Sequence, residues 1–573
     1  MENPELDQME DKVMISAQTT PTCTAPKRGG WTTFPFIIGT VTGLTLAASG
    51  WSVNLMVFLI RKFNVSSIAA TKINNVVIGC NSLFPVVGAI LADSFFGSFS
   101  VVTVFSFVSL LGMTMLTVIA GVQSLRPSEC PFGSLNPCEH PSWLQYLVLY
   151  AALALASLGV GGTRYTIATM GANQFDNVKD QRDFFNWYVL ALSVSSIISS
   201  TAIVYVQDNV GRGLGFGICL VSNAISLALF LFGKAFYRKI IPKGSPFVSI
   251  ARVVVSAILK RKMVLSLTES DYYYGTEMPK MGHSAATRSF RFLNRAALKT
   301  ENDRKFDGIY RKSWKLCSVE EVEDLKTLIR IIPIWSAGIM VSTTIAISGN
   351  LTILQALTMN RNIGSTNFKI PAASFVVFNL ISTIIAIIIF NRALIPLWES
   401  LTHHSPTPLQ RLGLAYVINI ISLVSSALIE TQRLHVVRTH GLTHRPGSVV
   451  PMSALWLVIP MSILGIAEAF VPVQIGLYYQ EFPKFMKDTS TAVVSLMVGI
   501  GFYLGTAIID VVDRITGWLP NNINEGRVDN MFWLMVVIAV LNSGYYLVCA
   551  KLFKYRHNDD VANEESNIEL IAH

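Results

Sequence analysis

Twelve long runs of apolar residues, separated by short polar segments, dominate the pattern of this chain. A helix needs about 20 residues to cross a hydrocarbon core of roughly 30 Å, and each run is long enough. A backbone that crosses a membrane must satisfy its own hydrogen bonds, so the pattern predicts an all-α membrane protein with twelve transmembrane helices. The predicted spans are 33–60, 72–92, 99–122, 143–172, 184–206, 214–236, 331–354, 370–390, 409–429, 454–478, 491–512 and 531–552.

A long polar segment divides the twelve runs into two groups of six. We expect, in order, an N-terminal tail, a six-helix bundle, a basic linker, a second six-helix bundle and a C-terminal tail. These parts correspond to residues 1–28, 29–236, 237–328, 329–555 and 556–573. Paired helical halves are typical of alternating-access transporters, in which the substrate binds near the membrane midplane between the halves.

Composition and charge agree with a multi-pass membrane protein. The chain is 51% hydrophobic and only 14% charged, with a mean hydropathy of +0.48. Its net charge of +9 is concentrated in the linker, for example at Lys260-Arg261-Lys262. Because basic segments are retained on the cytosolic side, we expect the linker and both termini in the cytosol. Beside twelve spans, this basic segment indicates contact with anionic membrane lipids and not with nucleic acid.

The cysteines indicate one candidate disulfide and no metal site. Cys130 and Cys138 lie close together in a loop predicted to be outside the cell, where an oxidised pair is plausible. The other cysteines lack the spacing of metal ligands. No nucleophile and base pairing and no phosphate-binding glycine loop stands in the membrane portion, so we expect neither an enzyme nor a cofactor.

Arg164 is the most informative residue, because it lies within an apolar span while the first span contains no acidic residue. A charge at membrane depth is costly and usually marks a substrate or ion pathway, and a cation there indicates an anionic substrate. The planar guanidinium suits a planar oxyanion such as nitrate, whereas chloride would be held by charge alone. Thr42, Thr45 and Thr163 are candidate hydroxyl donors, although threonines in helices often bond to their own backbone.

Glu468 is the one acid deep within a predicted span, the tenth. It is a candidate for gating or coupling. Buried charges usually find partners, so a bridge between Arg164 and Glu468 that binds no anion is an alternative, as is a gate that also binds anions.

Several short motifs resemble a known family. Residues 88–97, which include Asp93, resemble the loop signature of the major facilitator superfamily. Other segments resemble the plant nitrate transporter 1/peptide transporter family, among them Asn173-Gln174-Phe175-Asp176, Pro333-Ile334-Trp335 and Glu481-Phe482-Pro483. The resemblance implies the major facilitator fold, with twelve helices in two six-helix bundles, and assigns Asp93 to gating or coupling.

The chain departs from this family in its first helix. Members typically carry a Glu-x-x-Glu-Arg motif after a Gly-Gly-Trp, but residues 41–45 here are Val, Thr, Gly, Leu and Thr. The family's fourth-helix cation, usually Lys, corresponds to Arg164. Since arginine stays protonated and the motif's carboxylates are missing, we do not expect proton symport by the family route.

The missing charges also resemble the nitrate excretion branch of the family, whose members move nitrate outward across the plant plasma membrane. A negative-inside potential favours anion exit by about 2.3 kcal/mol per charge for each 100 mV, so efflux needs no coupled proton. The sequence therefore predicts nitrate efflux. The alternatives are chloride efflux, transport of a larger family substrate such as a hormone or a glucoside, and an anion sensor that transports nothing.

Overall fold

The computed structural model describes residues 29–128, 139–238, 246–266, 268, 271–274, 287, 289–300, 314–364, 368–445, 447–482 and 487–553. Within these ranges the structure does not describe the side chains of residues 93, 94, 178, 246, 247, 480 and 487–492. The described residues contain twelve helical spans that are long and apolar enough to cross a membrane, which confirms the predicted number.

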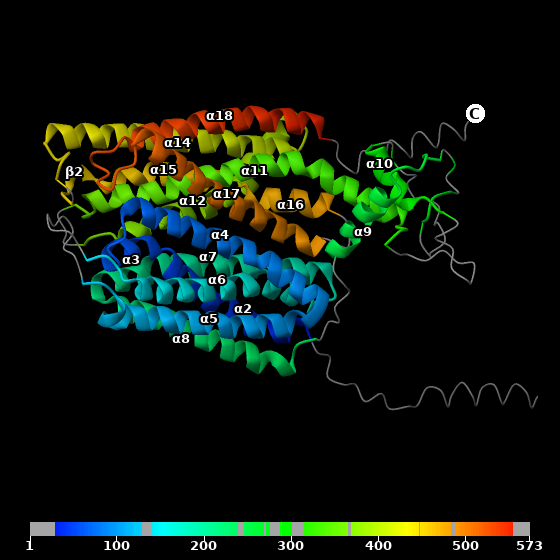
Figure 1. Cartoon of the computed structure of the whole chain (residues 1–573), viewed down its shortest axis with the longest axis horizontal. Helices are drawn as coiled ribbons and strands as arrows, with labels where there is room; N and C mark the ends of the chain where they lie inside the picture. The colour runs from blue at the N-terminus through cyan, green and yellow to red at the C-terminus, as the bar shows by residue number, and fades with distance from the viewer. Residues whose placement is uncertain are drawn as a thin grey trace, which may run out of the picture.

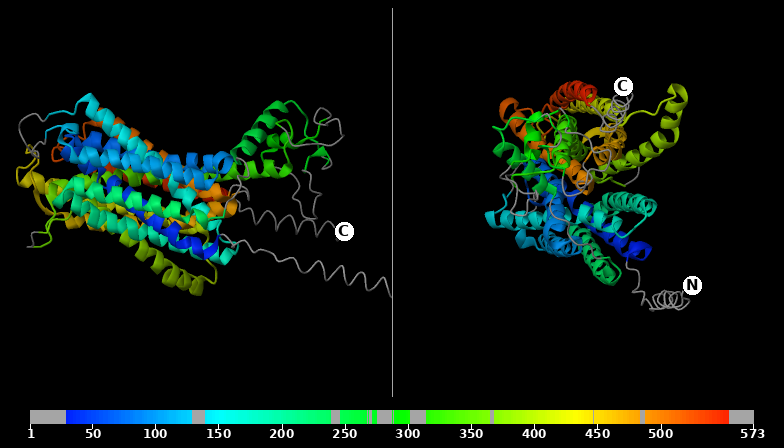
Figure 2. Two further views of the ribbon diagram at one scale, coloured as in Figure 1. Left: turned by 90° about the horizontal axis from the view of Figure 1, so that it is seen from below. Right: turned by 90° about the vertical axis from the view of Figure 1, so that its right-hand side faces the viewer.

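Six spans form the first bundle and six form the second, and the bundles lie side by side with their helices roughly aligned (Figures 1 and 2). The first bundle consists of α2 (Phe34–Ser52), α3 (Leu55–Lys62), α4 (Ser67–Leu91), α5 (Ser98–Gly121), α6 (Trp143–Ala172), α7 (Val178–Ile198) and α8 (Arg212–Phe232). The second consists of α11 (Val319–Thr358), α12 (Val376–Ile389), α13 (Ile395–Thr402), α14 (Pro408–Thr439), α15 (Val458–Glu468), α16 (Val471–Glu481), α17 (Lys487–Thr516) and α18 (Val528–Leu552).

Shorter elements extend or connect these helices. Among the described residues, the π-helical turns include η2 (Ala92–Phe96), η4 (Ser199–Ile203), η5 (Val206–Val210) and η11 (Phe390–Leu394). The 3₁₀ turns there include η1 (Gly30–Thr33), η3 (Gln123–Leu125), η6 (Gly233–Ala235), η8 (Arg295–Ala297), η10 (Ala372–Phe375) and η12 (Ala454–Leu457). Two short parallel strands, β1 (Met359–Asn360) and β2 (Val450–Ser453), pair in the second bundle.

The start of α6 shows how local sequence defines an element. Ser142 and Gln145 form a capping box, in which the Ser142 hydroxyl accepts from the Gln145 amide and the Gln145 side chain accepts from the Ser142 amide. These two bonds satisfy backbone donors that have no partner inside the helix. The helix therefore begins at Trp143, where the hydrophobic pattern predicts it to begin.

Two predicted spans are not continuous helices. The first breaks at Val53 and Asn54, between α2 and α3, and the tenth breaks at Ala469 and Phe470, between α15 and α16. Pro472 in the first turn of α16 explains the second break, because proline has no amide hydrogen to continue the preceding helix. Glu468 is the last residue of α15 and therefore lies directly at this break.

The linker contains structure that its polarity did not predict. An apolar helix, α9 (Pro246–Leu259), and a short helix, α10 (Arg291–Asn294), pack against the start of α11. The helix α11 begins at Val319, well before the predicted apolar span, since Ser318 and Glu321 form a capping box there. Its polar first turns contact α9 and α10, as Figure 1 shows.

The two bundles are joined at the end opposite α9 and α10, which we call the far end (Figure 1). On α4, Lys72 Nζ lies 2.7 Å from Asp510 Oδ1 and 3.4 Å from Asp513 Oδ2 of α17. The Ser374 hydroxyl of η10 donates to the Ser200 carbonyl of η4 at 2.7 Å. Contacts of this kind close the space between the bundles at the far end.

Candidate functional site

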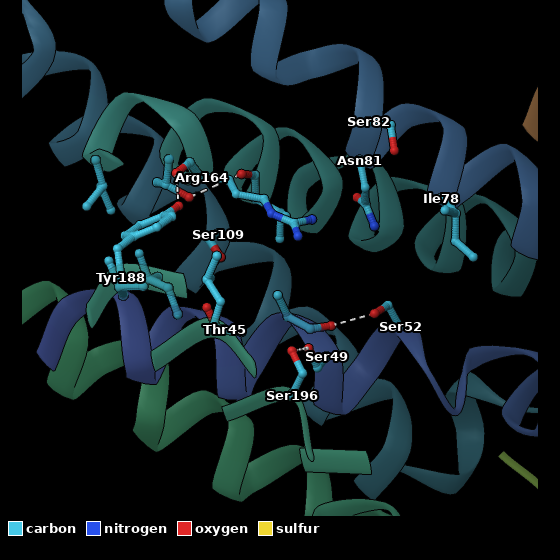
Figure 3. A pocket seen from close by; sticks show the side chains of 17 residues that line it. Thr45, Ser49, Ser52, Ile78, Asn81, Ser82, Ser109, Arg164, Tyr188 and Ser196 are labelled. Atoms are coloured by element: carbon cyan, nitrogen blue, oxygen red, sulfur yellow. Dashed lines mark hydrogen bonds between the residues drawn. The ribbon is translucent and has the colours of Figure 1, made fainter. Parts of the chain in front are cut away.

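A cavity of about 240 Å³ lies within the first bundle, between α2, α4, α5, α6 and α7 (Figure 3). Of its 17 lining residues, Arg164 is the only charged one. Nine others are neutral and polar, namely Thr45, Ser49, Ser52, Asn81, Ser82, Ser109, Thr163, Tyr188 and Ser196. Because the other polar lining groups are neutral, this one cation gives the cavity a net positive charge.

Two glycines of α6 allow the close packing that positions Arg164. A Cβ atom on Gly159 would lie 2.3 Å from Ser109 Cβ, and one on Gly162 would lie 2.1 Å from Phe105 Cγ, both on α5. Small residues at such contacts let membrane helices approach closely. Each helical residue turns by about 100°, so Arg164 projects from the side of α6 roughly opposite Gly162, away from α5 and into the cavity.

The Arg164 side chain is exposed to the cavity. No carboxylate lies within ion-pair distance of its guanidinium in the part of the chain that the structure describes. Its carbonyl accepts a hydrogen bond from the buried Tyr188 hydroxyl at 2.7 Å, which holds α7 against this turn of α6. The guanidinium thus retains its donors for a ligand, and an ionised donor forms stronger hydrogen bonds than a neutral one.

Asn81 of α4 faces the guanidinium across the cavity (Figure 3). Its Oδ1 is buried and has no hydrogen-bond partner among the described residues. Because the oxygen and nitrogen of an amide are assigned by their surroundings, a rotated amide would present N–H donors instead. A buried polar atom without a partner is costly and indicates that a ligand or water completes this site.

The hydroxyl groups of the cavity differ in what they already bond. Thr163 donates to the Gly159 carbonyl at 2.8 Å, and Ser52 donates to the Ala48 carbonyl at 2.7 Å, so both bond within their own helices. Thr45 lines the cavity and is directed toward it in Figure 3. Thr42 is not among the lining residues. The structure therefore brings Thr45 and Thr163 together with Arg164, and a donor role for Thr163 would require its backbone bond to break.

Most of the polar lining was not singled out from the sequence. Thr45, Ser49 and Ser52 recur at intervals of four and three residues, which places them on one face of α2. This spacing is a signal that a search for polar stripes would find. Asn81 and Ser82 lack such a signal, because a pair of small polar residues in an apolar helix is equally consistent with helix packing.

Glu468 lines a different cavity, of about 250 Å³, in the second bundle between α11, α14, α15, α16 and α17. Arg164 is not among the residues of that cavity, and Glu468 is not among those of the first. The alternative of an Arg164 to Glu468 bridge is therefore not formed in this conformation.

The side chains of three predicted functional residues are not among those that the structure describes. The backbone of Asp93 belongs to η2, but its side chain is not described. Cys130 and Cys138 fall in the segment 129–138, outside the described residues, so the proposed disulfide stays a prediction. Within the described ranges, no cluster of three or more His, Cys, Asp or Glu side chains has the arrangement of a metal site.

Comparison with known proteins identifies the family. The family model PTR2, which represents the POT family, matches residues 99–525, well over half of the chain. The chain belongs to the POT family. Among its POT relatives in Arabidopsis thaliana, NRT1/PTR FAMILY 2.3 is 48% identical over 543 residues, which cover 94% of this chain and 95% of the relative. NRT1/PTR FAMILY 2.7 is 48% identical over 548 residues, which cover 95% and 96%.

These matches confirm the plant NRT1/PTR family that the sequence motifs indicate. Among solved structures, the POT family transporter PepTSo has a TM-score of 0.68 at 18% identity, covering 91% of this chain and 99% of that one. This likeness confirms the major facilitator fold with two six-helix bundles. The POT chain described here is thus a membrane transporter and not an enzyme.

Proposed function

We propose that this transporter moves nitrate outward across the plasma membrane by alternating access, with the Arg164 guanidinium holding the anion. One observation carries the proposal: Arg164 is the only charge in the cavity of the first bundle, and no carboxylate neutralises it within the described residues. A membrane-buried cation that has no protein counter-ion is stabilised by a bound anion.

The size and chemistry of the cavity favour a small planar anion. Its volume of about 240 Å³ is below the range of roughly 300–1,000 Å³ typical for pockets of drug-sized ligands. This argues against a hormone or a glucoside. The guanidinium presents parallel N–H donors that match two oxygens of a planar anion, whereas chloride accepts through a single centre. Asn81 and Thr45 lie where they could bond a third oxygen.

The cavity also supports transport without proton symport. Val41, Leu44 and Thr45 occupy the charged positions of the family's first-helix motif, and all three line the cavity beside Arg164. The residues that would titrate next to the substrate are therefore neutral in this chain. A negative-inside potential provides about 2.3 kcal/mol per charge for each 100 mV toward anion exit, so outward flux needs no other driving force.

Alternating access requires the two bundles to move relative to each other, so that the cavity opens to one side of the membrane at a time. In this conformation the bundles are joined at the far end by Lys72, Asp510, Ser200 and Ser374. We place the basic linker and both termini in the cytosol, so the far end faces outward and must separate to release the anion. The partly exposed ion pair of Lys72 is weak enough to break and re-form during transport.

Anion flux in proteoliposomes tests this proposal. The purified protein is reconstituted, the membrane potential is clamped, and nitrate and chloride fluxes are compared with and without a pH gradient. We expect nitrate flux that follows the potential, exceeds chloride flux, and is unchanged when the pH gradient is removed. Nitrate flux that collapses without the pH gradient would overturn the coupling claim, and faster chloride flux would reassign the substrate. Anion binding with no flux of either ion would identify a sensor.

A further inference from the structure

A second group of cations lies at the far end, where the two bundles meet. Arg61 is in the last turn of α3 in the first bundle, and Arg361 follows β1 in the second. Lys369 belongs to the same turn as Arg361, because residues 362 and 369 form an antiparallel bridge and the Ile370 amide donates to the Arg361 carbonyl at 3.1 Å. In Figure 1, α3 and the strand β2 that pairs with β1 lie at this same end of the molecule.

The turn is packed against the first bundle. Phe368 stacks on Tyr205, with ring centroids 5.5 Å apart and planes at 9°. Tyr205 directly precedes η5, which carries Asp208. The stacking therefore places the cations of the second bundle beside charged groups of the first.

Arg361 is buried without a full set of partners. The residue is only 6% exposed, and its Nη1 donates to the Ile370 carbonyl at 3.2 Å. Its Nε is buried and has no hydrogen-bond partner among the described residues. A buried guanidinium with an open donor is costly, because the donor has lost water and gained nothing in return.

The acid near this cluster is engaged through one of its two oxygens. Asp208 Oδ1 accepts from Asn54 Nδ2 at 3.2 Å and lies 3.6 Å from Arg212 Nη2, whereas Oδ2 is buried and has no hydrogen-bond partner among the described residues. Burial, together with repulsion from Arg61, lowers the pKa of Arg361 to about 10, while Asp208 acts in the opposite direction. Burial and the two arginines Arg361 and Arg61 likewise lower the pKa of Lys369. Burial is thus the main cost of charging Arg361 and Lys369, and repulsion from the neighbouring arginines adds to it.

We propose that Arg61, Arg361 and Lys369 form a second binding site for a small inorganic anion, which bridges the two bundles at the far end. The choice of nitrate as its ligand rests on the proposed function, whereas the presence of an anion site does not. The bound anion accepts from the open Nε of Arg361 and offsets the repulsion between the cations. It thereby stabilises the closed far end, and it occupies the last position on the outward path before the bundles separate.

Nitrate-dependent thermal stability of the full chain in detergent tests the second site. The unfolding temperature is measured as nitrate replaces gluconate at constant ionic strength, for the unaltered protein and for Arg164→Ala, Arg361→Gln and the double variant. A ligand that binds only the folded state stabilises that state by RT ln(1 + [L]/Kd), so the unfolding temperature keeps rising as the nitrate concentration exceeds the dissociation constant. We expect Arg164→Ala to retain part of the nitrate response and the double variant to lose it. A residual response that is the same in Arg164→Ala and in the double variant, or the absence of any response in Arg164→Ala, would overturn the second site.

Two further variants keep the test decisive. Arg438→Gln removes an exposed cation in the last turn of α14 and should leave the nitrate response unchanged. Lys369→Gln changes an exposed side chain of the cluster, so it decides the question if Arg361→Gln does not fold. We expect Lys369→Gln, measured together with Arg164→Ala, to raise about tenfold the nitrate concentration that produces a given rise in unfolding temperature, the loss of one charge-assisted bond. An unchanged dependence on nitrate concentration would count against the site.

The two proposals fail in different ways. If Arg164→Ala leaves both nitrate flux and the nitrate response intact while Arg361→Gln removes the response, the proposed function is wrong and the far-end site stands. If Arg164→Ala removes the flux while Arg361→Gln changes nothing, the far-end site is wrong and the proposed function stands.

Discussion

Arg164 in the first bundle and Arg433 in the second are both arginines within membrane-spanning helices, but their surroundings are opposite. Arg433 is fully buried, and its Nε and Nη2 donate to the two oxygens of Glu430 at 2.8 and 2.7 Å. Its Nη1 donates to Asn524 Oδ1 at 2.7 Å. Arg164 lines a cavity and has no carboxylate partner among the described residues.

The two arginines differ in whether the protein itself uses their hydrogen-bond donors. The paired Arg433 satisfies its donors inside the protein and ties α14 to the loop before α18, so it stabilises the second bundle. The guanidinium of Arg164 has no carboxylate partner among the described residues, so its donors are open to the cavity, as the proposed function requires. The two arginines thus differ in whether a carboxylate lies nearby and not in residue type.

Among the variants that test this comparison, Arg433→Met is expected to have the largest effect, a loss of stability. This change leaves Glu430 buried without a counter-ion, which should lower the free energy of unfolding by about 3–5 kcal/mol. Thermal unfolding in detergent measures it. Adding Glu430→Leu should restore much of the loss, because the uncompensated charge is removed. Arg164→Ala should change stability much less, and equal losses for the two arginines would break the distinction between them.

The next effect is expected from restoring the family motif as Val41→Glu, Leu44→Glu and Thr45→Arg. All three positions line the cavity, so the new carboxylates would titrate beside Arg164. Nitrate flux in proteoliposomes should then become severalfold faster with a pH gradient than without one. Thr45→Arg alone adds charge but no titrating group, so it serves as the control and should stay insensitive. A triple variant that ignores the pH gradient would contradict our explanation of the missing coupling.

A smaller effect is expected from Asn81→Ala, which removes the unpartnered amide opposite Arg164. Loss of one hydrogen bond to the anion costs about 1 kcal/mol, so the nitrate concentration for half-maximal flux should rise about fivefold. Ser52→Ala is the matched control, since this hydroxyl lines the same cavity but donates to its own helix. If the two variants behave alike, Asn81 does not contact the anion.

The smallest effect is expected from Glu468→Gln. Glu468 lies in the other cavity and forms no bridge to Arg164, so nitrate flux should stay within about twofold of the unaltered protein. Reconstituted flux measures this directly. A loss beyond tenfold would show that Glu468 couples to the anion in a conformation other than this one.

The hydrophobic pattern was sufficient for the general architecture. It predicts twelve spans in two groups of six, because length and apolarity alone decide whether a helix can cross a membrane. It also identifies Arg164, because an isolated cation in an apolar run is visible without any structure. The hydrophobic pattern shows both broken spans as continuous runs, because it registers only apolarity. Pro472 is a local signal for the break at Ala469, whereas the break at Asn54 has no proline beside it.

The pairing of charges could not be predicted. The predicted ninth span ends at 429, so Glu430 and Arg433 fall outside it, yet α14 continues to Thr439. A buried ion pair offsets part of the desolvation cost of both charges, but hydropathy counts each charge separately. The far-end cations could not be predicted either, because Arg61 and Arg361 are 300 residues apart in the chain and only folding brings them together.

Nitrate flux through Arg164→Ala tests the central claim most directly. The variant is reconstituted at the same density as the unaltered protein, and efflux is measured under a clamped, negative-inside potential with Arg438→Gln as the control. We predict that Arg164→Ala falls to the rate of protein-free liposomes, that Arg164→Lys keeps part of the flux with a weaker preference for nitrate over chloride, and that the control is unaffected. Undiminished nitrate flux in Arg164→Ala would contradict the account.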